Sequence, residues 1–189
     1  MAGNYPAFLK GHLLMAMPGM VDPNFAQTVT CICEHNRDGA MGIVVNRVHE
    51  GLQAKDVFEE LAIACRPERR AGAVYSGGPV HAGELFVLHG TPLEWGATLQ
   101  ITPQLGLSNT RDILEAIADG RGPADFLISL GCAGWGPGQL EAEIRENAWL
   151  TEMVDAEILF KLPIESRWEE ALRRIGVDPM LLSDTAGHA

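Results

Sequence analysis

The chain has 189 residues, of which 47% are hydrophobic and 21% charged, and its formal net charge at pH 7 is −11. This is the composition of a folded protein, long enough to bury a hydrophobic core within one domain over residues 1–189. The acidic balance repels phosphate backbones and anionic membrane surfaces. We therefore expect neither direct nucleic-acid binding nor association with a membrane.

Apolar runs are too short to suggest a membrane span. The longest one near the start, Leu13 to Met17, is cut off by Pro18, well short of the roughly 20 residues that a helix needs to cross a bilayer. No basic segment and cleavage site of a secretory signal accompany it. The cysteines form no Cys-x-x-Cys pair and stand at Cys31, Cys33, Cys65 and Cys132. These features predict a cytoplasmic protein with reduced thiols.

Strand patterns dominate the first half of the chain. Runs of β-branched and apolar residues predict strands at 9–17, 28–35 and 40–46. The turn Asn36-Arg37-Asp38-Gly39 carries an Asp-Gly signal and joins the last two as a hairpin. Asp56 and Glu59 have the spacing of a capping box, which predicts a short helix through about Ile63.

Helices enter mainly in the second half. Further strands are predicted at 74–76, 84–88, 98–102, 126–130 and 157–161. Helices are predicted at 110–119, from Pro137 to about Glu146, and around Trp168, Leu172 and Ile175 before Gly176. Strands in runs with helices inserted late favour an α+β fold built on a mixed sheet.

The segment Gly131 to Gly138 is the most unusual in the sequence and is predicted to be a loop between a strand and a helix. Backbone N–H groups in such a loop could bind an anion. However, the loop lacks the Lys-Ser/Thr ending of a Walker motif, and Gln139 stands where a dinucleotide fingerprint needs its third glycine. Glu141 and Glu143 would also repel a phosphate. A tight structural turn is therefore the favoured interpretation.

A second glycine segment, Gly77-Gly78-Pro79, also follows a probable core strand. We expect the two glycine segments to meet beside Trp135 and to form a cleft. Its candidate binding residues are His35, Asn46, Gly77, Gly78, Pro79, Gly134, Trp135, Gly136 and Gln139. A partly exposed Trp135 would be the wall of this cleft, whereas a buried Trp135 would indicate a structural turn.

Cys31, Cys33 and His35 lie two residues apart, so on a regular strand all three point to one face, as metal ligands would. No fourth ligand is evident, and cysteines are common in buried strand faces. We expect a core stripe, with no bound metal and no cofactor. Cys132 near a helix N-terminus could be a nucleophile, but a buried, inert cysteine is the favoured interpretation.

A serine hydrolase would recruit a serine and a histidine, and the candidates are Ser76 or Ser108 with His35, His81 or His89. The sequence has no Gly-x-Ser-x-Gly nucleophile elbow, so we reject this function and assign no catalytic residue.

Several short motifs occur in an order that resembles the bacterial AlgH/YqgE family. They are Lys10-Gly11-His12-Leu13-Leu14, Met17-Pro18-Gly19-Met20, Asp22-Pro23-Asn24-Phe25, Cys33-Glu34-His35-Asn36, Gly39-Ala40-Met41-Gly42, Gly77-Gly78-Pro79-Val80, Gly131 to Glu141 and Gly187-His188-Ala189. The resemblance covers nearly the whole chain. It implies a curved, partly barrel-like sheet flanked by helices, in a family without an agreed biochemical activity, some of whose members are named as regulators of exopolysaccharide or alginate synthesis.

The sequence therefore favours a noncatalytic cytoplasmic protein that binds or regulates through a glycine-rich cleft, with a small molecule or a protein as partner. An enzyme or thiol redox sensor that uses Cys132 or His35 is the alternative. A transcriptional regulator is suggested by the family name alone and is opposed by the acidic charge. The oligomeric state stays open.

Overall fold

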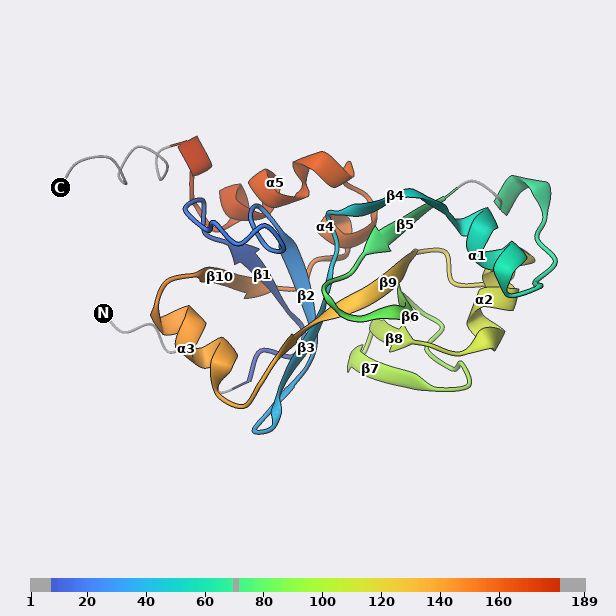
Figure 1. Cartoon of the computed structure of the whole chain (residues 1–189), viewed down its shortest axis with the longest axis horizontal. Coiled ribbons are helices and arrows are strands. Elements are labelled where there is room, and N and C mark those ends of the chain that lie inside the picture. The colour runs from blue at the N-terminus through green and yellow to red at the C-terminus, as the bar shows by residue number, and fades with distance from the viewer. Residues whose placement is uncertain (1–7, 70–71, 181–189) are drawn as a thin grey trace.

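A long curled sheet organises the molecule (Figure 1). The computed structural model describes residues 8–69 and 72–180, and the strands of this part join in the order β10-β1-β2-β3-β9-β6-β8-β7, with β5 beside β9 and β4 beside β5. The β5–β9 pair is parallel and the other described pairs are antiparallel, so the sheet is mixed. The predicted α+β class with a curved, partly barrel-like sheet is confirmed.

The strands are β1 (His12–Ala16), β2 (Val29–Asn36), β3 (Gly39–Val44), β4 (Val48–Gln53), β5 (Ala73–Ser76), β6 (Val80–His89), β7 (Thr98–Thr102), β8 (Leu105–Ser108), β9 (Phe126–Trp135) and β10 (Trp149–Met153). The α-helices are α1 (Ala54–Glu60), α2 (Arg111–Ala118), α3 (Gln139–Arg145), α4 (Ala156–Phe160) and α5 (Arg167–Arg174). Short 3₁₀ turns occupy Pro67–Arg69 and Ile164–Ser166. In Figure 1, α3 lies toward one end of the molecule and α1 and α2 toward the other.

Strand β9 joins the two halves of the sheet. Its first half pairs with β5 and β6, and its second half pairs with β3. Gly131 has φ +73° between the two halves, a backbone conformation that glycine adopts without a steric penalty. The predicted loop from Gly131 to Gly138 is therefore wrong over its first five residues, which continue the strand because Ala40–Gly42 supply a hydrogen-bonding partner.

Two helix starts differ from the prediction. Gly138, with φ +71°, is the N-cap of α3, so Pro137 precedes the helix instead of lying in its first turn. Helix α1 begins at Ala54, and the Asp56 carboxylate accepts the Gln53 backbone N–H at 2.8 Å. Asp56 is thus the third residue of the helix and not its cap.

The predicted strand at 157–161 is also wrong, because this segment is helix α4. The Asp155 carboxylate accepts the Glu157 backbone N–H at 2.7 Å and caps the helix. The strand of this region is β10, which pairs with β1. Strands at the other predicted places are confirmed, as are the helices at 110–119 and around Trp168.

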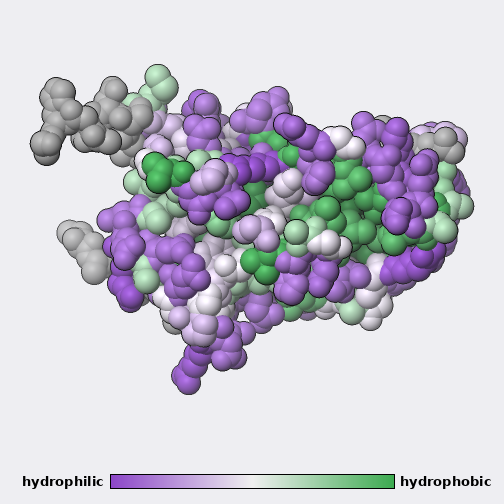
Figure 2. All heavy atoms as spheres, in the orientation of Figure 1, coloured by the Kyte–Doolittle hydropathy of each residue, from purple (hydrophilic) through white to green (hydrophobic). Residues whose placement is uncertain are grey.

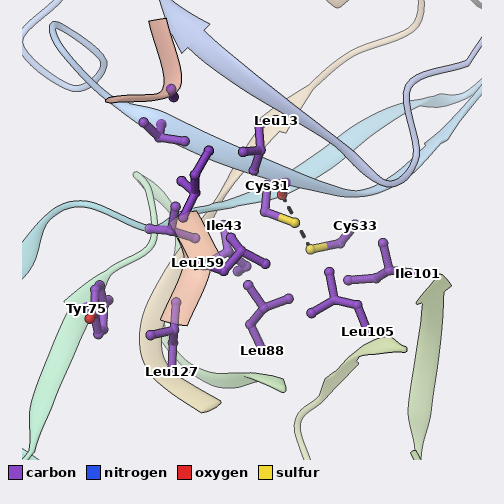
Figure 3. Close-up of a cluster of buried hydrophobic side chains, with 14 of the residues drawn as sticks. Leu13, Cys31, Cys33, Ile43, Tyr75, Leu88, Ile101, Leu105, Leu127 and Leu159 are labelled. Atoms are coloured by element: carbon purple, nitrogen blue, oxygen red, sulfur yellow. Dashed lines mark hydrogen bonds between the residues drawn. The ribbon is translucent and has the colours of Figure 1, made fainter. Parts of the chain in front are cut away.

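Hydrophobic side chains fill three clusters on the faces of the sheet. The largest lies inside the curl, where Cys31 and Cys33 point toward Leu88, Ile101 and Leu105 (Figure 3). The second lies under α1 and α2, and the third lies under α3. The sheet therefore has an inner face, whose main core also includes residues of α4 and α5, and an outer face, which α1, α2 and α3 partly cover.

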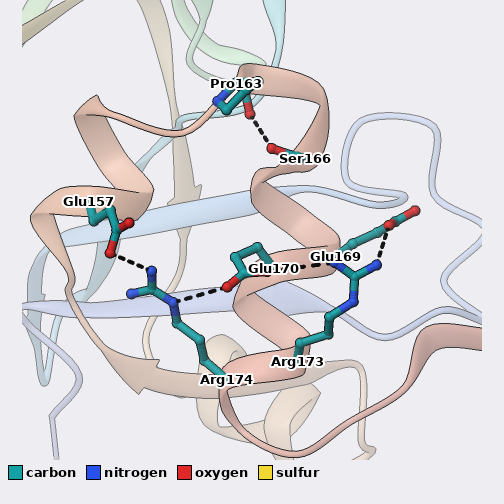
Figure 4. A network of polar contacts seen from close by, with 7 residues as sticks. All are labelled: Glu157, Pro163, Ser166, Glu169, Glu170, Arg173 and Arg174. Carbon is teal, nitrogen blue, oxygen red and sulfur yellow. Dashed lines mark hydrogen bonds and ion pairs between the residues drawn. The ribbon is translucent and has the colours of Figure 1, made fainter.

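Helices α4 and α5 are joined by charged side chains (Figure 4). Arg174 pairs with Asp155, with Glu157 at 2.7 Å and with Glu170 at 3.6 Å. The Trp168 indole N–H donates to the Ala16 carbonyl at 2.9 Å and fixes α5 to β1. The mixed-charge face of α5 is thus largely engaged within the protein.

The face of the molecule shown in Figure 2 is mostly polar, with an apolar area over the part that holds β4, β5 and β9. Val48, on the edge strand β4, is 43% exposed. In the described part of the chain, none of the helices combines the length and the hydropathy that a bilayer span requires.

Candidate functional site

The two predicted glycine segments do meet, but they meet backbone to backbone. A Cβ atom added to Gly77 would lie 2.3 Å from the Gly131 carbonyl oxygen, and one added to Gly78 would lie 2.3 Å from the Cys132 carbonyl carbon. Gly134, farther along β9, lies against Val80. The glycines therefore allow the segment between β5 and β6 to touch β9, and the contact between Gly77–Gly78 and β9 has no space for a ligand.

Trp135 is 6% exposed and belongs to the core under α3. Its ring stacks on Phe25 at a centroid distance of 6.0 Å and meets the Trp149 ring edge to face. The Glu143 carboxylate accepts the indole N–H of Trp135 at 2.9 Å and that of Trp149 at 2.8 Å. A buried Trp135 is what we expect of a structural turn.

Gly136 and Gln139 belong to the same corner. The Gly136 backbone N–H donates to the Gln139 side-chain oxygen at 2.9 Å, and the Gln139 amide donates to Glu143 at 2.9 Å. Pro79 is exposed beside the strand contact described above. The polar groups of this corner are thus engaged with one another.

His35 lies on the α3 side of the sheet. A β-bulge between Ile32 and Glu34 interrupts the register and turns His35 away from the face that carries the two cysteines. Its Nδ1 accepts the Leu9 backbone N–H at 2.9 Å, so its Nε2–H donates to Glu141 at 3.1 Å. The one-face arrangement predicted from spacing is therefore wrong.

Among residues 8–69 and 72–180, no three His, Cys, Asp or Glu side chains gather as metal ligands would. The hydrogen bond to Cys31, followed by burial, raises the pKa of the Cys33 thiol well above its ordinary value. Cys132 is 1% exposed, and burial, followed by the charge of Glu84, raises its thiol pKa. A raised pKa lowers the thiolate fraction that nucleophilic or redox chemistry requires.

Asn46 is the predicted cleft residue that lines a surface cavity. Its side-chain oxygen accepts the Val29 N–H at 2.8 Å, and its amide donates to the Gln27 carbonyl at 2.8 Å. The cavity, of about 270 Å³, is also lined by Arg47 and Glu165, and none of the glycines is among its lining residues. The nine residues predicted to form one cleft therefore lie in several different parts of the structure.

A different cavity, which we call the β7–β8 groove, opens where β7 and β8 approach β3. It has a volume of about 460 Å³ and is lined by residues from four strands and the adjoining loops: Met41, Phe86, Ala97, Thr98, Leu99, Leu107, Ser108 and Asn109. Phe86 and Leu107 belong to the main core, and Met41 and Leu99 pack against it. The groove is therefore an opening onto the inside of the curled sheet, which is where barrel-like folds commonly hold ligands.

Charge distinguishes this groove from four other surface cavities. Each of those carries at least one charged side chain, such as Lys55, Arg47, Asp125 or Arg173. None of the described residues that line the β7–β8 groove is charged. Its polar lining residues are Thr98, Ser108 and Asn109, and the absence of charge among the described lining residues suits an uncharged ligand.

A chain of three polar side chains lies on the face of the sheet opposite Leu99 and Leu107. Thr98 Oγ1 lies 2.7 Å from Ser108 Oγ, which lies 2.9 Å from His89 Nε2. His89 Nδ1 lies 2.7 Å from the Gly90 carbonyl, and both His89 and Ser108 are almost fully buried. Burial lowers the pKa of His89 below its ordinary value of 6.5, so the ring is neutral at pH 7.

The sequence contained Ser108 and His89 as separate candidates, but it did not predict their contact or the groove. The missing element was β8, which places Ser108 opposite Val87 and next to Thr98. One signal was present in Gly106, because a Cβ there would lie 2.8 Å from Thr98 and 3.2 Å from His89. A glycine within a short apolar run often marks such a close approach.

The sequence model of the AlgH-like family matches residues 13–180. The chain belongs to the AlgH-like family. It is 53% identical over 181 residues to a UPF0301 protein of Desulforapulum autotrophicum, with 96% of each chain covered. It is 50% identical over 186 residues to the UPF0301 protein AlgH of Pseudomonas aeruginosa, with 97% of each covered. The family resemblance is thus confirmed, although its Gly187-His188-Ala189 motif lies outside the described residues.

Solved structures agree with this assignment. The solution structure of AlgH from Pseudomonas aeruginosa superposes with a TM-score of 0.79 at 50% identity and full coverage of both chains. A crystal structure of a Corynebacterium diphtheriae protein shares the fold, with a TM-score of 0.76, 23% identity and coverage of 97% and 94%. The names of these proteins state no ligand and no reaction, so the function has to be inferred from the geometry of the site.

Proposed function

We propose that this AlgH-like protein is a noncatalytic binding protein with a regulatory role in the cytoplasm, and that its ligand occupies the β7–β8 groove. The supporting observation is a cavity of about 460 Å³ that opens onto the main core and has no charged side chain among its described lining residues. The binding role expected from the sequence is kept. Its location moves from the glycine segments to this groove.

The chemistry around the groove favours binding over catalysis. The Ser108 hydroxyl is buried and lies between Thr98 and His89, so a substrate carbonyl has little access to it. Cys132 is buried and is held as a thiol by its raised pKa. These features do not suit the activated nucleophiles that covalent catalysis requires.

The glycine segments support the groove indirectly. Gly134 pairs with Met41, which lines the groove, and Gly131 lies where β9 passes from β5 and β6 to β3. The close approach of Gly77–Gly78 to β9 lets the two halves of the sheet join without a gap. In this view the glycine-rich motifs shape the curl, and the curl makes the groove.

A ligand screen tests the proposal. Neutral and charged small molecules are added to the purified full chain, and thermal unfolding is followed, because a ligand at 100 times its Kd stabilises the native state by about 2.7 kcal/mol. We expect neutral compounds to raise the Tm of the wild type and of Val48→Asp, a matched control on the distant edge strand. Leu99→Asp should abolish this rise, because it places a charge in the groove.

Stabilisation that persists in Leu99→Asp would place the ligand elsewhere. Stabilisation by charged compounds alone would also contradict a neutral groove.

A further inference from the structure

Strand β7 ends the sheet beside the β7–β8 groove and is paired on one side only. Its partner is β8, and no backbone hydrogen bond joins its other edge to any residue that the structure describes. Ala97, Thr98 and Leu99 follow one another along the groove. Because the Thr98 side chain lies on the opposite face of the sheet from Leu99, its main chain is what borders the groove. The groove therefore adjoins the unpaired edge of a strand.

The composition of β7 leaves this edge open to another strand. Edge strands are commonly protected against strand addition by charged side chains or bulges. The other two strands that end the sheet in the described part of the chain have such protection, because β4 contains Glu50 and an irregular register and β10 contains Glu152. Strand β7 has neither a charged residue nor a proline, and its register is regular from Thr98 to Gln100. It is thus the edge best suited to accept an extended segment.

A carboxylate without a partner lies beside the same groove. Glu34 is paired with Met41 in the β2–β3 register, so the two side chains share a face of the sheet, and Met41 lines the groove. Glu34 is half-buried, and its carboxylate has neither an ion pair nor a hydrogen bond within residues 8–69 and 72–180. A charge that is partly withdrawn from water without a counter-ion is unfavourable. A cation brought by a ligand is therefore stabilised there.

We infer that the β7–β8 groove binds an extended segment of a partner protein, which adds to β7 as a strand and carries a Lys or Arg that pairs with Glu34. The inference rests on the proposed function and names the chemistry of its ligand. Main-chain hydrogen bonds to β7 provide affinity, and alternate apolar side chains of the segment contact the walls of the groove. These walls are formed by Met41, Phe86, Leu99 and Leu107.

A second copy of this chain suits the groove less well than a different protein. Each copy has a formal net charge of −11, so two copies repel each other at long range. Pairing of β7 with the β7 of another copy also brings no Lys or Arg to Glu34, because β7 has no charged residue. The occupant is therefore a segment with an uncharged, apolar centre and a basic residue at one end.

Four hexapeptides with blocked ends test this inference on the full chain. The parent peptide has an N-terminal lysine followed by alternating valine and threonine, and the second replaces the lysine by uncharged acetyl-lysine. The other two are the parent with N-methyl groups on alternate peptide bonds, one peptide for each edge of the extended chain. Binding is followed by the NMR signals of Met41, Leu99 and Leu107.

We expect the parent peptide to bind the wild type roughly 2- to 5-fold more tightly than the acetyl-lysine peptide, the range of a partly exposed ion pair. One N-methylated peptide should lose binding, because its methyl groups replace the N–H donors that face β7, and the other should keep it. Glu34→Gln should remove the preference for lysine. Glu152→Gln, on the edge strand β10, is the matched control and should retain the preference.

The other outcomes identify which proposal fails. Binding of both N-methylated peptides would overturn strand addition. Equal binding of the first two peptides to the wild type, or an unchanged preference in Glu34→Gln, would overturn the pairing with Glu34.

A separate comparison distinguishes this inference from the proposed function. If no peptide moves the groove signals while neutral compounds still stabilise the wild type but not Leu99→Asp, the inference fails and the groove remains a site for small molecules. Failure of both experiments would overturn both proposals. Groove signals that move with protein concentration alone would place a second copy of the chain there and overturn the choice of partner.

Discussion

Glu143 holds together the corner at the end of β9. Its two carboxylate oxygens accept the indole N–H groups of Trp135 and Trp149 and the amide of Gln139. Burying two indoles beside Phe25 leaves their N–H groups in need of acceptors, and one half-buried carboxylate meets both needs. The residues Trp135 and Gln139, which the sequence suggested for a cleft, thus serve the stability of this corner.

Truncation of Trp135 should therefore destabilise the protein severely. We expect Trp135→Ala to lower the free energy of unfolding by about 3–5 kcal/mol through cavity formation. Trp95→Ala is the matched control. Trp95 is half-exposed, so its truncation should lower the free energy of unfolding much less. Urea denaturation measures both, and similar losses in the two variants would show that the burial of Trp135 contributes little.

The burial of His89 predicts how stability depends on pH. Desolvation lowers its pKa in the folded protein below 6.5, whereas the unfolded chain titrates near that ordinary value. Below pH 6.5 the unfolded state therefore binds the proton more readily than the folded state. The stability that the neutral His89 ring contributes to the folded protein is complete above pH 6.5 and is lost as the pH falls toward the folded-state pKa.

The measurement is the free energy of unfolding between pH 8 and about pH 5.5, where the unfolded-state imidazole becomes mostly charged. In the wild type the free energy of unfolding should decline as the pH falls over this range, and His89→Gln should make that decline smaller. His49→Gln, which replaces an exposed histidine, should leave it unchanged. A decline that is identical in wild type and His89→Gln would assign the acid sensitivity to other groups.

At the scale of elements, the sequence predicted those parts whose pattern is local. The β2–β3 hairpin, the apolar face of α2 and the end of α5 at Gly176 all follow from nearby residues. It did not predict β4, β8 and β10, because β4 is largely exposed and β8 has only four residues. Tertiary pairing forms these strands, and β10 exists because β1 offers it an edge.

The same distinction explains the candidate site. The sequence located the glycine segments and their contact, because glycine marks close backbone approaches. The β7–β8 groove is assembled from residues 41, 86, 97–99 and 107–109, whose proximity depends on how the sheet curls. No local pattern encodes that distance, so the groove could only be found in the folded chain.

Two glycines test whether close approach or backbone conformation matters more. Gly78 has φ +146°, and a Cβ there would lie 2.3 Å from the Cys132 carbonyl carbon. Gly138 has φ +71°, and a Cβ added there would meet nothing within 4 Å beyond its neighbours in the chain. Gly138→Ala should therefore cost only the left-handed backbone penalty of about 1–2 kcal/mol.

Gly78→Ala should cost considerably more than Gly138→Ala, because β5 and β9 would have to move apart. Thermal unfolding of the two variants provides the comparison. An equal loss of stability in both variants would mean that β5 and β9 can move apart at little cost, and that the curl of the sheet does not depend on this contact.

At the scale of the whole molecule, two features matter together: the curl of the sheet and the negative charge of the surface. The curl encloses an apolar core that opens at the β7–β8 groove, while the surface carries the net charge of −11. Many of the basic side chains are already engaged within the protein. Arg66, Arg111 and Arg173 pair with carboxylates, and Arg47 and Arg167 donate to backbone carbonyls.

This distribution predicts that the protein does not bind DNA tightly, despite the regulatory names within its family. Each phosphate contact releases counterions and contributes about −0.9 to the slope of log K against log salt, so affinity for DNA requires a surface of available cations. Here Arg66, Arg111 and Arg173 are paired with carboxylates of the protein, and the excess of carboxylates repels the duplex. We expect no shift of duplex DNA in a gel assay at nanomolar protein and physiological salt. A sequence-specific shift with a steep salt dependence would contradict this and restore the transcriptional alternative, whereas an effect on gene expression without DNA binding fits a protein that acts through a ligand or a protein partner.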